Sequence, residues 1–232
     1  MTNKLALIAF DADDTLWHNL IHFDAAQKQF GQIFVNHMPE AQAIAVLEKT
    51  ESRNIKLYGF GAKSFTLSMI EAAIEVSNGT VDAATISKLI ATGRDMLDHS
   101  IELLPHVEDT LKALHGDYKL LLITKGDLHH QERKVLASGL AHYFESVEIV
   151  STKKPETYHH IATRHGHATT KMLMAGNSIR SDVLPMIQAG GVGVYVPFEV
   201  VWAHEHEEVP KGMERFYEVE DLRGVVEVVR KL

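Results

Sequence analysis

An uninterrupted apolar run near the start of the chain ends abruptly in a cluster of acids. Residues 5–10 are all apolar, and Asp11, Asp13, Asp14 and Thr15 follow. A strand with no polar face is typical of a parallel sheet that helices cover on both sides. Because side chains alternate along a strand, Asp11 and Asp13 are expected on the same side of its end. Two neighbouring carboxylates repel each other unless a proton or a cation reduces their charge, and this hard oxygen site indicates Mg²⁺.

The length of the chain allows one large domain or a domain with an insertion. The 232 residues carry 23 Lys and Arg against 31 Asp and Glu, a formal net charge of −8 that argues against a nucleic acid as partner. The chain has no cysteine, which excludes disulfides and thiolate metal sites. No apolar run approaches the length of a membrane span, and no cleavable signal is recognisable. We therefore expect a cytoplasmic protein without a membrane partner.

Residues 17–100 have the composition of a separate helical unit. They are rich in Ala, Gln, Glu, Lys, Ile and Leu, and Pro39 is their single proline. Asp82 is a suitable N-cap for the last of four expected helices. These helices are expected at residues 23–37, 40–53, 63–76 and 82–99. Because helices of this kind form a small bundle of their own, we expect residues 1–16 and 101–232 to make up a second domain.

From residue 101 onward, apolar strands alternate with helices. The expected strands span residues 119–123, 146–150, 172–175 and 192–196. This alternation predicts an α/β fold with a doubly wound, Rossmann-like parallel sheet, into which the all-helical domain is inserted. Such sheets bind ligands at the carboxyl ends of their strands. The polar groups that follow strands in this chain are Asp11 with Asp13, Thr124, Lys154, and Asn177 with Asp182.

In their order, these groups resemble the four motifs of the haloacid dehalogenase superfamily of hydrolases. Residues 11–15 match the D-x-D-x-T signature, and Thr124 matches the hydroxyl residue after the second strand. Lys154 matches the lysine that precedes a proline, and residues 176–182 match the last motif, G-D-S with a later aspartate. The helical insertion resembles the helical, C1-type cap domain of this family in its position and helicity.

Two positions depart from the family pattern. Asp14 stands where glycine is common, and we expect a solvated turn residue there without a catalytic role. Asn177 stands where aspartate is common, and its amide oxygen can ligate a metal without contributing negative charge. The resemblance therefore implies a weaker metal site in which Asp182 is the more important acid.

The resemblance implies a phosphatase that works through an aspartyl phosphate. Asp11 would attack phosphorus, while Asp13 would protonate the leaving alcohol and later deprotonate the attacking water. Thr124 would hold phosphoryl oxygens. Lys154 would neutralise charge, and it is preferred to Lys153 because it directly precedes the proline. A halide leaves without a proton, so the presence of Asp13 argues against dehalogenation.

The resemblance also implies Mg²⁺ as the cofactor and a substrate held in part by the helical insertion. The implied metal ligands are Asp11, the backbone carbonyl of Asp13, Asn177 and Asp182. The candidate substrate-binding residues are Lys125, Arg53, Tyr58 and Lys63, of which the last three flank a glycine-bearing loop in the insertion. The stretch Trp202–Glu208 is expected to be an exposed loop.

The expected activity is therefore Mg²⁺-dependent hydrolysis of a small phosphorylated metabolite. A phosphotransferase such as a sugar-phosphate mutase is the nearest alternative. A phosphonate-cleaving relative would need a Schiff-base lysine, for which Lys49, Lys56 and Lys63 are available. A phosphate-binding module without catalysis is the non-enzymatic alternative. The motifs select neither the substrate nor the oligomeric state.

Overall fold

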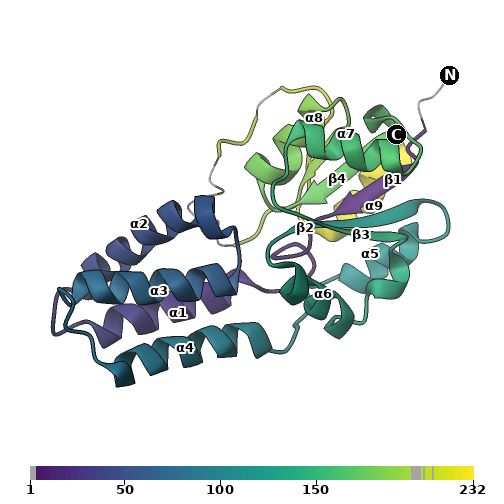
Figure 1. Ribbon diagram of the computed structural model, residues 1–232. Coiled ribbons are helices and arrows are strands. Elements are labelled where there is room, and N and C mark those ends of the chain that lie inside the picture. The colour runs from purple at the N-terminus through teal and green to yellow at the C-terminus, as the bar shows by residue number, and fades with distance from the viewer. Residues whose placement is uncertain (1–3, 200–204, 206, 211) are drawn as a thin grey trace. The chain divides into compact units, whose positions relative to one another are not determined.

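The structure is a computed structural model that describes residues 4–199, 205, 207–210 and 212–232 (Figure 1). It divides the chain into two compact units. One comprises Met1–His18, Ile101–Lys125 and Gln131–Leu232, and the other comprises Asn19–Ser100 with Gly126–His130. The first boundary thus lies two residues beyond the expected one. The segment that follows the second strand groups with the helical unit, which sequence analysis did not foresee.

The predicted parallel sheet forms the centre of the first unit, and it has six strands where five were predicted. Its strand order is β3-β2-β1-β4-β5-β6. The strands are β1 (Leu7–Phe10), β2 (Lys119–Lys125), β3 (Ser146–Val150), β4 (Met172–Gly176), β5 (Val192–Tyr195) and β6 (Phe216–Glu218). The edge strand β6 was not predicted. Because β1 lies between β2 and β4, where the strand order reverses, the acids that follow β1 lie at the usual ligand-binding position of such sheets.

Helices cover both faces of this sheet. They are α5 (Val107–Leu114), α6 (Leu128–Ala137), α7 (Pro155–Arg164), α8 (Leu184–Gln188) and α9 (Leu222–Lys231), with short turns η1 (Ala141–Tyr143), η2 (Thr169–Lys171) and η3 (Ile179–Val183). Leu7 and Ala9 belong to one core with residues of α7 and α8. Ile8 and Phe10 belong to another with residues of α5 and α9. The four residues of β1 are fully buried, which explains its lack of a polar face.

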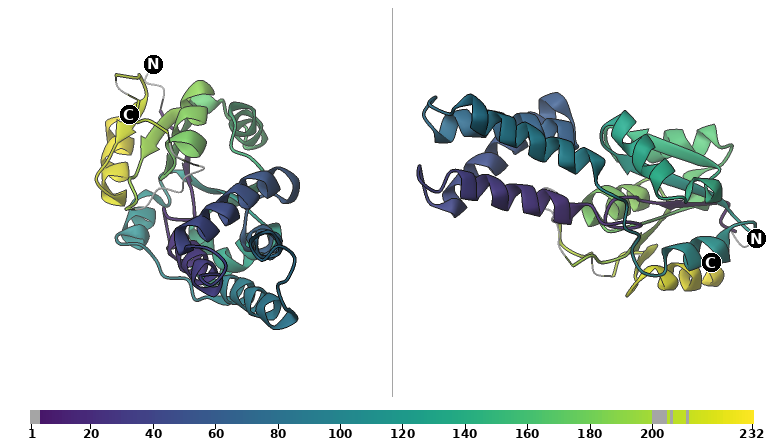
Figure 2. Two further views of the ribbon diagram at one scale, coloured as in Figure 1. Left: turned by 90° about the vertical axis from the view of Figure 1, so that its left-hand side faces the viewer. Right: turned by 90° about the horizontal axis from the view of Figure 1, so that it is seen from below.

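The second unit is a bundle of four helices, α1 (Leu20–Ile33), α2 (Glu40–Tyr58), α3 (Ala62–Val76) and α4 (Ala83–Asp98). Helix α3 packs against α2 and α4, and α1 packs against the same two helices (Figure 2). The predicted N-cap of α4 is confirmed, because Asp82 Oδ1 accepts a hydrogen bond from the Thr85 N–H at 2.6 Å. No helix in the described part of the chain is long and apolar enough to span a membrane.

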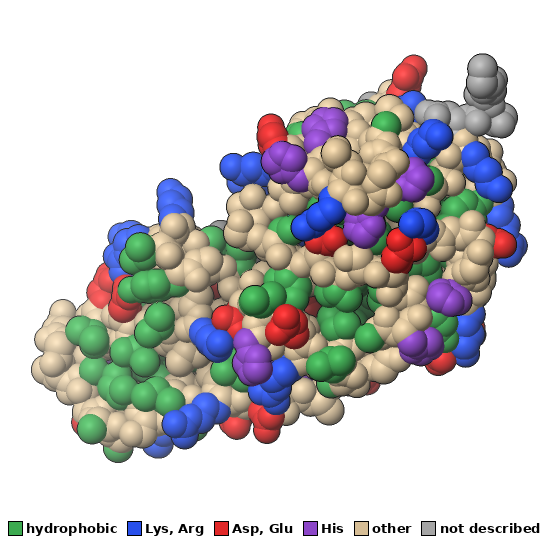
Figure 3. Space-filling model, turned by 45° about the vertical axis from the view of Figure 1, so that its right-hand side comes forward, with side chains coloured by type: hydrophobic (Ala, Val, Ile, Leu, Met, Phe, Trp, Pro, Cys, Tyr) green, Lys and Arg blue, Asp and Glu red, His purple; other side chains and the backbone are tan. Residues whose placement is uncertain are grey.

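The helical unit leaves some apolar side chains exposed. Leu67 and Ile74 are seven residues apart on α3, so they lie on the same face of that helix, and both are exposed. Figure 3 shows hydrophobic side chains gathered on one face of this unit. The four helices therefore cover only part of the apolar surface of their own bundle.

Candidate active site

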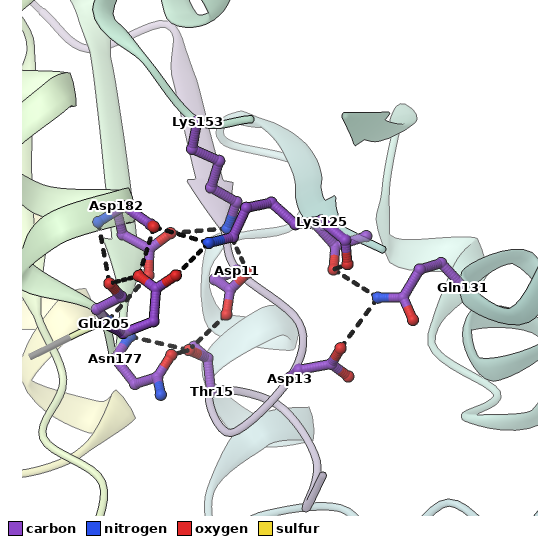
Figure 4. A network of polar contacts seen from close by, with 12 residues as sticks. Asp11, Asp13, Thr15, Lys125, Gln131, Lys153, Asn177, Asp182 and Glu205 are labelled. Carbon is purple, nitrogen blue, oxygen red and sulfur yellow. Dashed lines mark hydrogen bonds and ion pairs between the residues drawn. The ribbon is translucent and has the colours of Figure 1, made fainter. Parts of the chain in front are cut away.

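The carboxyl ends of β1, β3 and β4 bring a lysine and two aspartates together. The Lys153 ammonium group donates a hydrogen bond to Asp11, and it also donates to Asp182 Oδ1 at 2.7 Å (Figure 4). The side chains of Lys153 and Asp182 are each 1% exposed, and Asp11 is buried. The predicted meeting of the first and last motifs at one end of the sheet is therefore present in the structure.

The lysine at this position is Lys153, so the choice of Lys154 was wrong. The backbone of Lys154 is extended, with φ −121° and ψ 165°, and it precedes the first residue of α7. Consecutive side chains on extended backbone point in opposite directions. Lys153 accordingly points into the sheet end, whereas Lys154 is exposed. Adjacency to Pro155 identified the correct segment but not the correct side chain.

Asp182 lies on a single π-helical turn, η3, directly after β4. Its Oδ2 atom accepts a hydrogen bond from the Ser178 N–H at 3.0 Å. A Cβ atom on Gly176 would lie 2.3 Å from the same oxygen, so only glycine leaves room for the carboxylate here. Such turns are frequent at functional sites because their extra residue redirects side chains. The turn and the glycine together place Asp182 against the end of β4.

The three charged groups at this position perturb one another. Burial raises the pKa of Asp11 to about 7, against the opposing effect of Lys153, and the charges of Asp182 and Asp13 add to the rise. Burial alone would lower the pKa of Lys153, but Asp11 and Asp182 outweigh it, so the pKa lies above its ordinary value. The site therefore combines a firmly protonated lysine with more buried carboxylate charge than that lysine compensates.

Thr15 connects the segment after β1 to the segment after β4. Its hydroxyl lies 3.3 Å from both Asp11 Oδ2 and Asn177 Oδ1, and it accepts a hydrogen bond from the Asn177 N–H at 3.0 Å. The amide oxygen of Asn177 is therefore held near the Asp11 carboxylate. The intervening Asp14 has the left-handed φ of 62°, which explains why glycine suits this position. Asp14 is buried, so the expectation of a solvated residue was wrong.

Asp13 has its own set of hydrogen-bond donors. Its Oδ1 atom accepts from Trp17 Nε1 at 2.8 Å and pairs with Lys134 Nζ at 2.5 Å. Its Oδ2 atom accepts from Gln131 Nε2 at 3.0 Å. Burial would raise the pKa of Asp13, but Lys134 and the hydrogen bonds more than offset it and hold the pKa below its ordinary value. Gln131 and Lys134 were not predicted as site residues, because polar residues in a helix usually indicate a solvated face.

Thr124 and Lys125 are the last two residues of β2, rather than residues that follow it. Thr124 is buried, and its Oγ1 atom accepts a hydrogen bond from Gln131 Nε2 at 2.7 Å. Gln131 thus bridges Thr124 and Asp13, and Figure 4 shows Gln131 beside Asp13. The Lys125 ammonium group donates to Ser181 Oγ at 2.8 Å, which places it on the η3 side of the site.

Glu205 is a further acid at this site that sequence analysis assigned to an exposed loop. Its carboxylate accepts hydrogen bonds from Lys125, from Ser178 and, at 2.5 Å, from Ser181 Oγ. Burial would raise the pKa of Glu205, but Lys125 and the two serines hold it below its ordinary value. The expectation of exposure was therefore wrong for Glu205 and right for Glu207 and Glu208. The rest of that stretch, 202–204 and 206, lies outside the described residues.

The substrate-binding candidates of the helical unit contact acidic side chains. Arg53 Nη2 lies 3.0 Å from Glu71 Oε2, and the Tyr58 hydroxyl donates to Glu71 Oε1 at 3.4 Å. Lys63 Nζ lies 2.9 Å from Asp127 Oδ1, in the segment that groups with this unit. Their assignment to substrate binding stays a prediction.

Comparison with known proteins agrees with this geometry. Residues 5–190 match the family model described as haloacid dehalogenase-like hydrolase. The structure resembles that of a haloacid dehalogenase-like family hydrolase from Xanthomonas campestris, with a TM-score of 0.88, 37% identity, and coverage of 98% of this chain and 91% of that chain. It also resembles 2-haloacid dehalogenase from Pseudomonas syringae pv. Tomato, with a TM-score of 0.64, 18% identity, and coverage of 98% and 99%, which shows a shared fold.

A curated relative is the N-acylneuraminate-9-phosphatase of Mus musculus. It is 26% identical over 127 residues, or 52% of this chain and 51% of the relative. The match thus spans about half the length of that protein. The family model covers most of the chain, including the four motifs that follow the strands. The Xanthomonas structure is similar to this one over nearly the whole chain. The chain therefore belongs to the haloacid dehalogenase-like hydrolases.

Proposed function

We propose that the chain is a Mg²⁺-dependent phosphohydrolase that acts on a small phosphorylated metabolite through a phosphoryl group carried by Asp11. The supporting observation is the pair of aspartates after β1, which have separate partners. Asp11 forms an ion pair with Lys153, which would compensate the negative charge of the nucleophile. The contacts of Asp13 are with Lys134, Gln131 and Trp17. Two carboxylates in different environments are suited to different roles in one reaction.

In the proposed first step, a carboxylate oxygen of Asp11 attacks phosphorus and the bond from phosphorus to the leaving oxygen breaks. The negative charge of the bound phosphoryl group would raise the pKa of Asp13, so that Asp13 carries a proton in this step and gives it to the leaving oxygen, which departs as an alcohol. In the second step, water attacks phosphorus, Asp13 takes a proton from the water, and inorganic phosphate leaves with Asp11 restored. Lys153 and the Thr124 hydroxyl would stabilise charge on the phosphoryl oxygens, which is the main source of catalysis in such transfers.

The donor set after β1 and β4 fits Mg²⁺. Asp11, Asp182 and the Asn177 amide offer hard oxygen atoms, and the buried carboxylates carry more negative charge than Lys153 neutralises. The amide oxygen of Asn177 and the backbone carbonyl of Asp13 would complete the set of metal ligands. Within the described ranges, no group of three His, Cys, Asp or Glu side chains could hold a metal ion. When bound, Mg²⁺ would neutralise phosphoryl charge and orient the substrate against the nucleophile.

Asp13 favours phosphate ester hydrolysis over dehalogenation, because a halide leaves without a proton whereas an alkoxide needs one. The murine relative is named N-acylneuraminate-9-phosphatase, which supports phosphatase chemistry among the activities of this family. A phosphotransferase would need an acceptor other than water. Release of inorganic phosphate without an added acceptor distinguishes hydrolysis from such transfer.

The test uses wild-type protein and Asp11→Asn with p-nitrophenyl phosphate, assayed with Mg²⁺ and with EDTA. We expect phosphate release by the wild type with Mg²⁺, and loss of nearly all release with EDTA or in the variant. An inert wild type, or a variant as active as the wild type, would contradict the proposal. A panel of phosphorylated metabolites then identifies the preferred substrate.

A further inference from the structure

Helix α6 directs two buried polar side chains at a single carboxylate. Gln131 and Lys134 are three residues apart on this helix, so they lie on the same face. Gln131 is 2% exposed and Lys134 is 4% exposed. Helical Gln and Lys side chains are usually solvated, and burying an ammonium group is costly unless a counter-charge meets it. The burial of both residues therefore calls for a specific partner, and that partner is Asp13.

The donors around Asp13 restrict how its carboxylate can rotate. Lys134 and Trp17 occupy Oδ1, at 2.5 and 2.8 Å, while Gln131 occupies Oδ2 at 3.0 Å. Donors on both oxygens define the plane of the carboxylate as well as its position, which one ion pair would not do. The Asp13 side chain remains 22% exposed, so it is accessible while it is held.

Gln131 also links this carboxylate to the end of β2. Its Nε2 group donates to Thr124 Oγ1 at 2.7 Å and to Asp13 Oδ2 at 3.0 Å. The acid of the proposed mechanism and the hydroxyl proposed to hold the phosphoryl group thus share one donor. Their relative placement depends on the side chain of Gln131.

We propose that Lys134 and Gln131 are positioning residues that fix Asp13 for proton transfer to the leaving oxygen. This inference rests on the proposed phosphohydrolase function. Neither residue has to touch the substrate, because both act through Asp13. The contribution is largest for leaving groups that are weak acids, since these depend most on a correctly placed proton donor.

The test compares phenyl phosphate with p-nitrophenyl phosphate, which have similar shapes but differ in the acidity of the phenol released. The measured quantity is kcat/KM, which reports on steps up to the first irreversible one, here release of the phenol. We expect Lys134→Met to lower kcat/KM on phenyl phosphate by at least about tenfold more than on p-nitrophenyl phosphate. Asp13→Asn should show the same selectivity. Lys134→Met should cause no further loss when combined with Asp13→Asn, because the group that it positions is already gone.

Lys119→Met is the matched control, because Lys119 forms an exposed ion pair with Glu145 at 2.6 Å near the start of β2. It should leave both rates unchanged. Gln131→Leu is the second variant, which removes a neutral donor and keeps the test decisive if Lys134→Met fails to fold. Because Gln131 also binds Thr124, we expect Gln131→Leu to lower kcat/KM on both substrates, with the larger loss on phenyl phosphate.

Several results would overturn the inference while leaving the proposed function intact. These are wild-type rates in both variants, equal losses on the two substrates, or a loss from Lys134→Met that persists in the Asp13→Asn background. A wild-type protein that cleaves p-nitrophenyl phosphate but not phenyl phosphate would also overturn it. A wild-type protein inert toward both substrates would instead overturn the proposed function.

Discussion

Lys153 and Asp182 form a fully buried ion pair, with 2.7 Å between Nζ and Oδ1, and the same ammonium group binds Asp11. The pair joins the loop after β3 to the turn after β4, so it connects segments that are far apart in the sequence. Breaking a buried pair from one side leaves an uncompensated charge, which typically costs about 3–5 kcal/mol.

We expect Lys153→Met to lower the free energy of unfolding by about that amount and to lower kcat/KM by about 100-fold or more, because the lysine also stabilises phosphoryl charge. Chemical denaturation and steady-state kinetics measure the two effects. Lys154→Met is the matched control: its side chain is exposed, so stability should change by less than about 0.5 kcal/mol. If Lys154→Met caused the larger loss of activity, the assignment of Lys153 would fail.

Asn177→Asp tests the metal site. Its amide oxygen lies 3.3 Å from the Thr15 hydroxyl, close to the Asp11 carboxylate. An added carboxylate charge should lower the Mg²⁺ concentration that gives half-maximal activity by roughly tenfold. Isothermal titration calorimetry of Mg²⁺ binding provides a readout independent of activity. Asn78→Asp, in an exposed turn of the helical unit, is the control and should change nothing. An unchanged or weaker affinity in Asn177→Asp would contradict the proposed ligand set.

The buried Glu51 on α2 predicts a pH-dependent stability. Burial, with a smaller contribution from Glu48, raises its pKa from 4.5 to about 7. Between these values the folded state binds more protons than the unfolded state, so the contribution of Glu51 to stability falls as the pH rises from about 4.5 to about 7.

Glu51→Gln should remove this dependence. Its free energy of unfolding relative to the wild type should rise by about 3 kcal/mol between pH 4.5 and pH 8. Urea denaturation at both pH values measures the difference. The exposed Glu75 on α3 supplies the control variant Glu75→Gln, for which the difference should stay constant. A constant difference for Glu51→Gln as well would show that Glu51 titrates normally.

The sequence predicts most of this fold for a physical reason. Strands β1, β2, β4 and β5 lie inside the sheet, so they appear as apolar runs, and the alternation with helices determines that the sheet is parallel. The edge strand β6 has three half-buried or exposed residues, so it carries no such signal. The π-helical turn that holds Asp182 was likewise not predicted.

The site is less completely predictable. The acids that follow β1 and β4 are recognisable because they belong to a set of four motifs whose order resembles that of a known family. Side chains alternate in direction along extended backbone, so only one of Lys153 and Lys154 can point into the site. Which one does so depends on the exact end of β3 and the exact start of α7, which the sequence does not define. Lys134 and Glu205 carry no local pattern that distinguishes them from solvated charges. They become recognisable only when tertiary contacts bring them to Asp13 and Lys125.

The most direct test of the central claim is the detection of a phosphoryl group on Asp11. Wild-type protein is mixed with substrate and Mg²⁺, quenched in acid within the first turnover, digested and analysed by mass spectrometry. The account predicts the added mass of one phosphoryl group on the peptide that contains Asp11, and its absence in Asp11→Asn. Phosphate release by the wild type without any such adduct, or an adduct on another residue that Asp11→Asn retains, would contradict it.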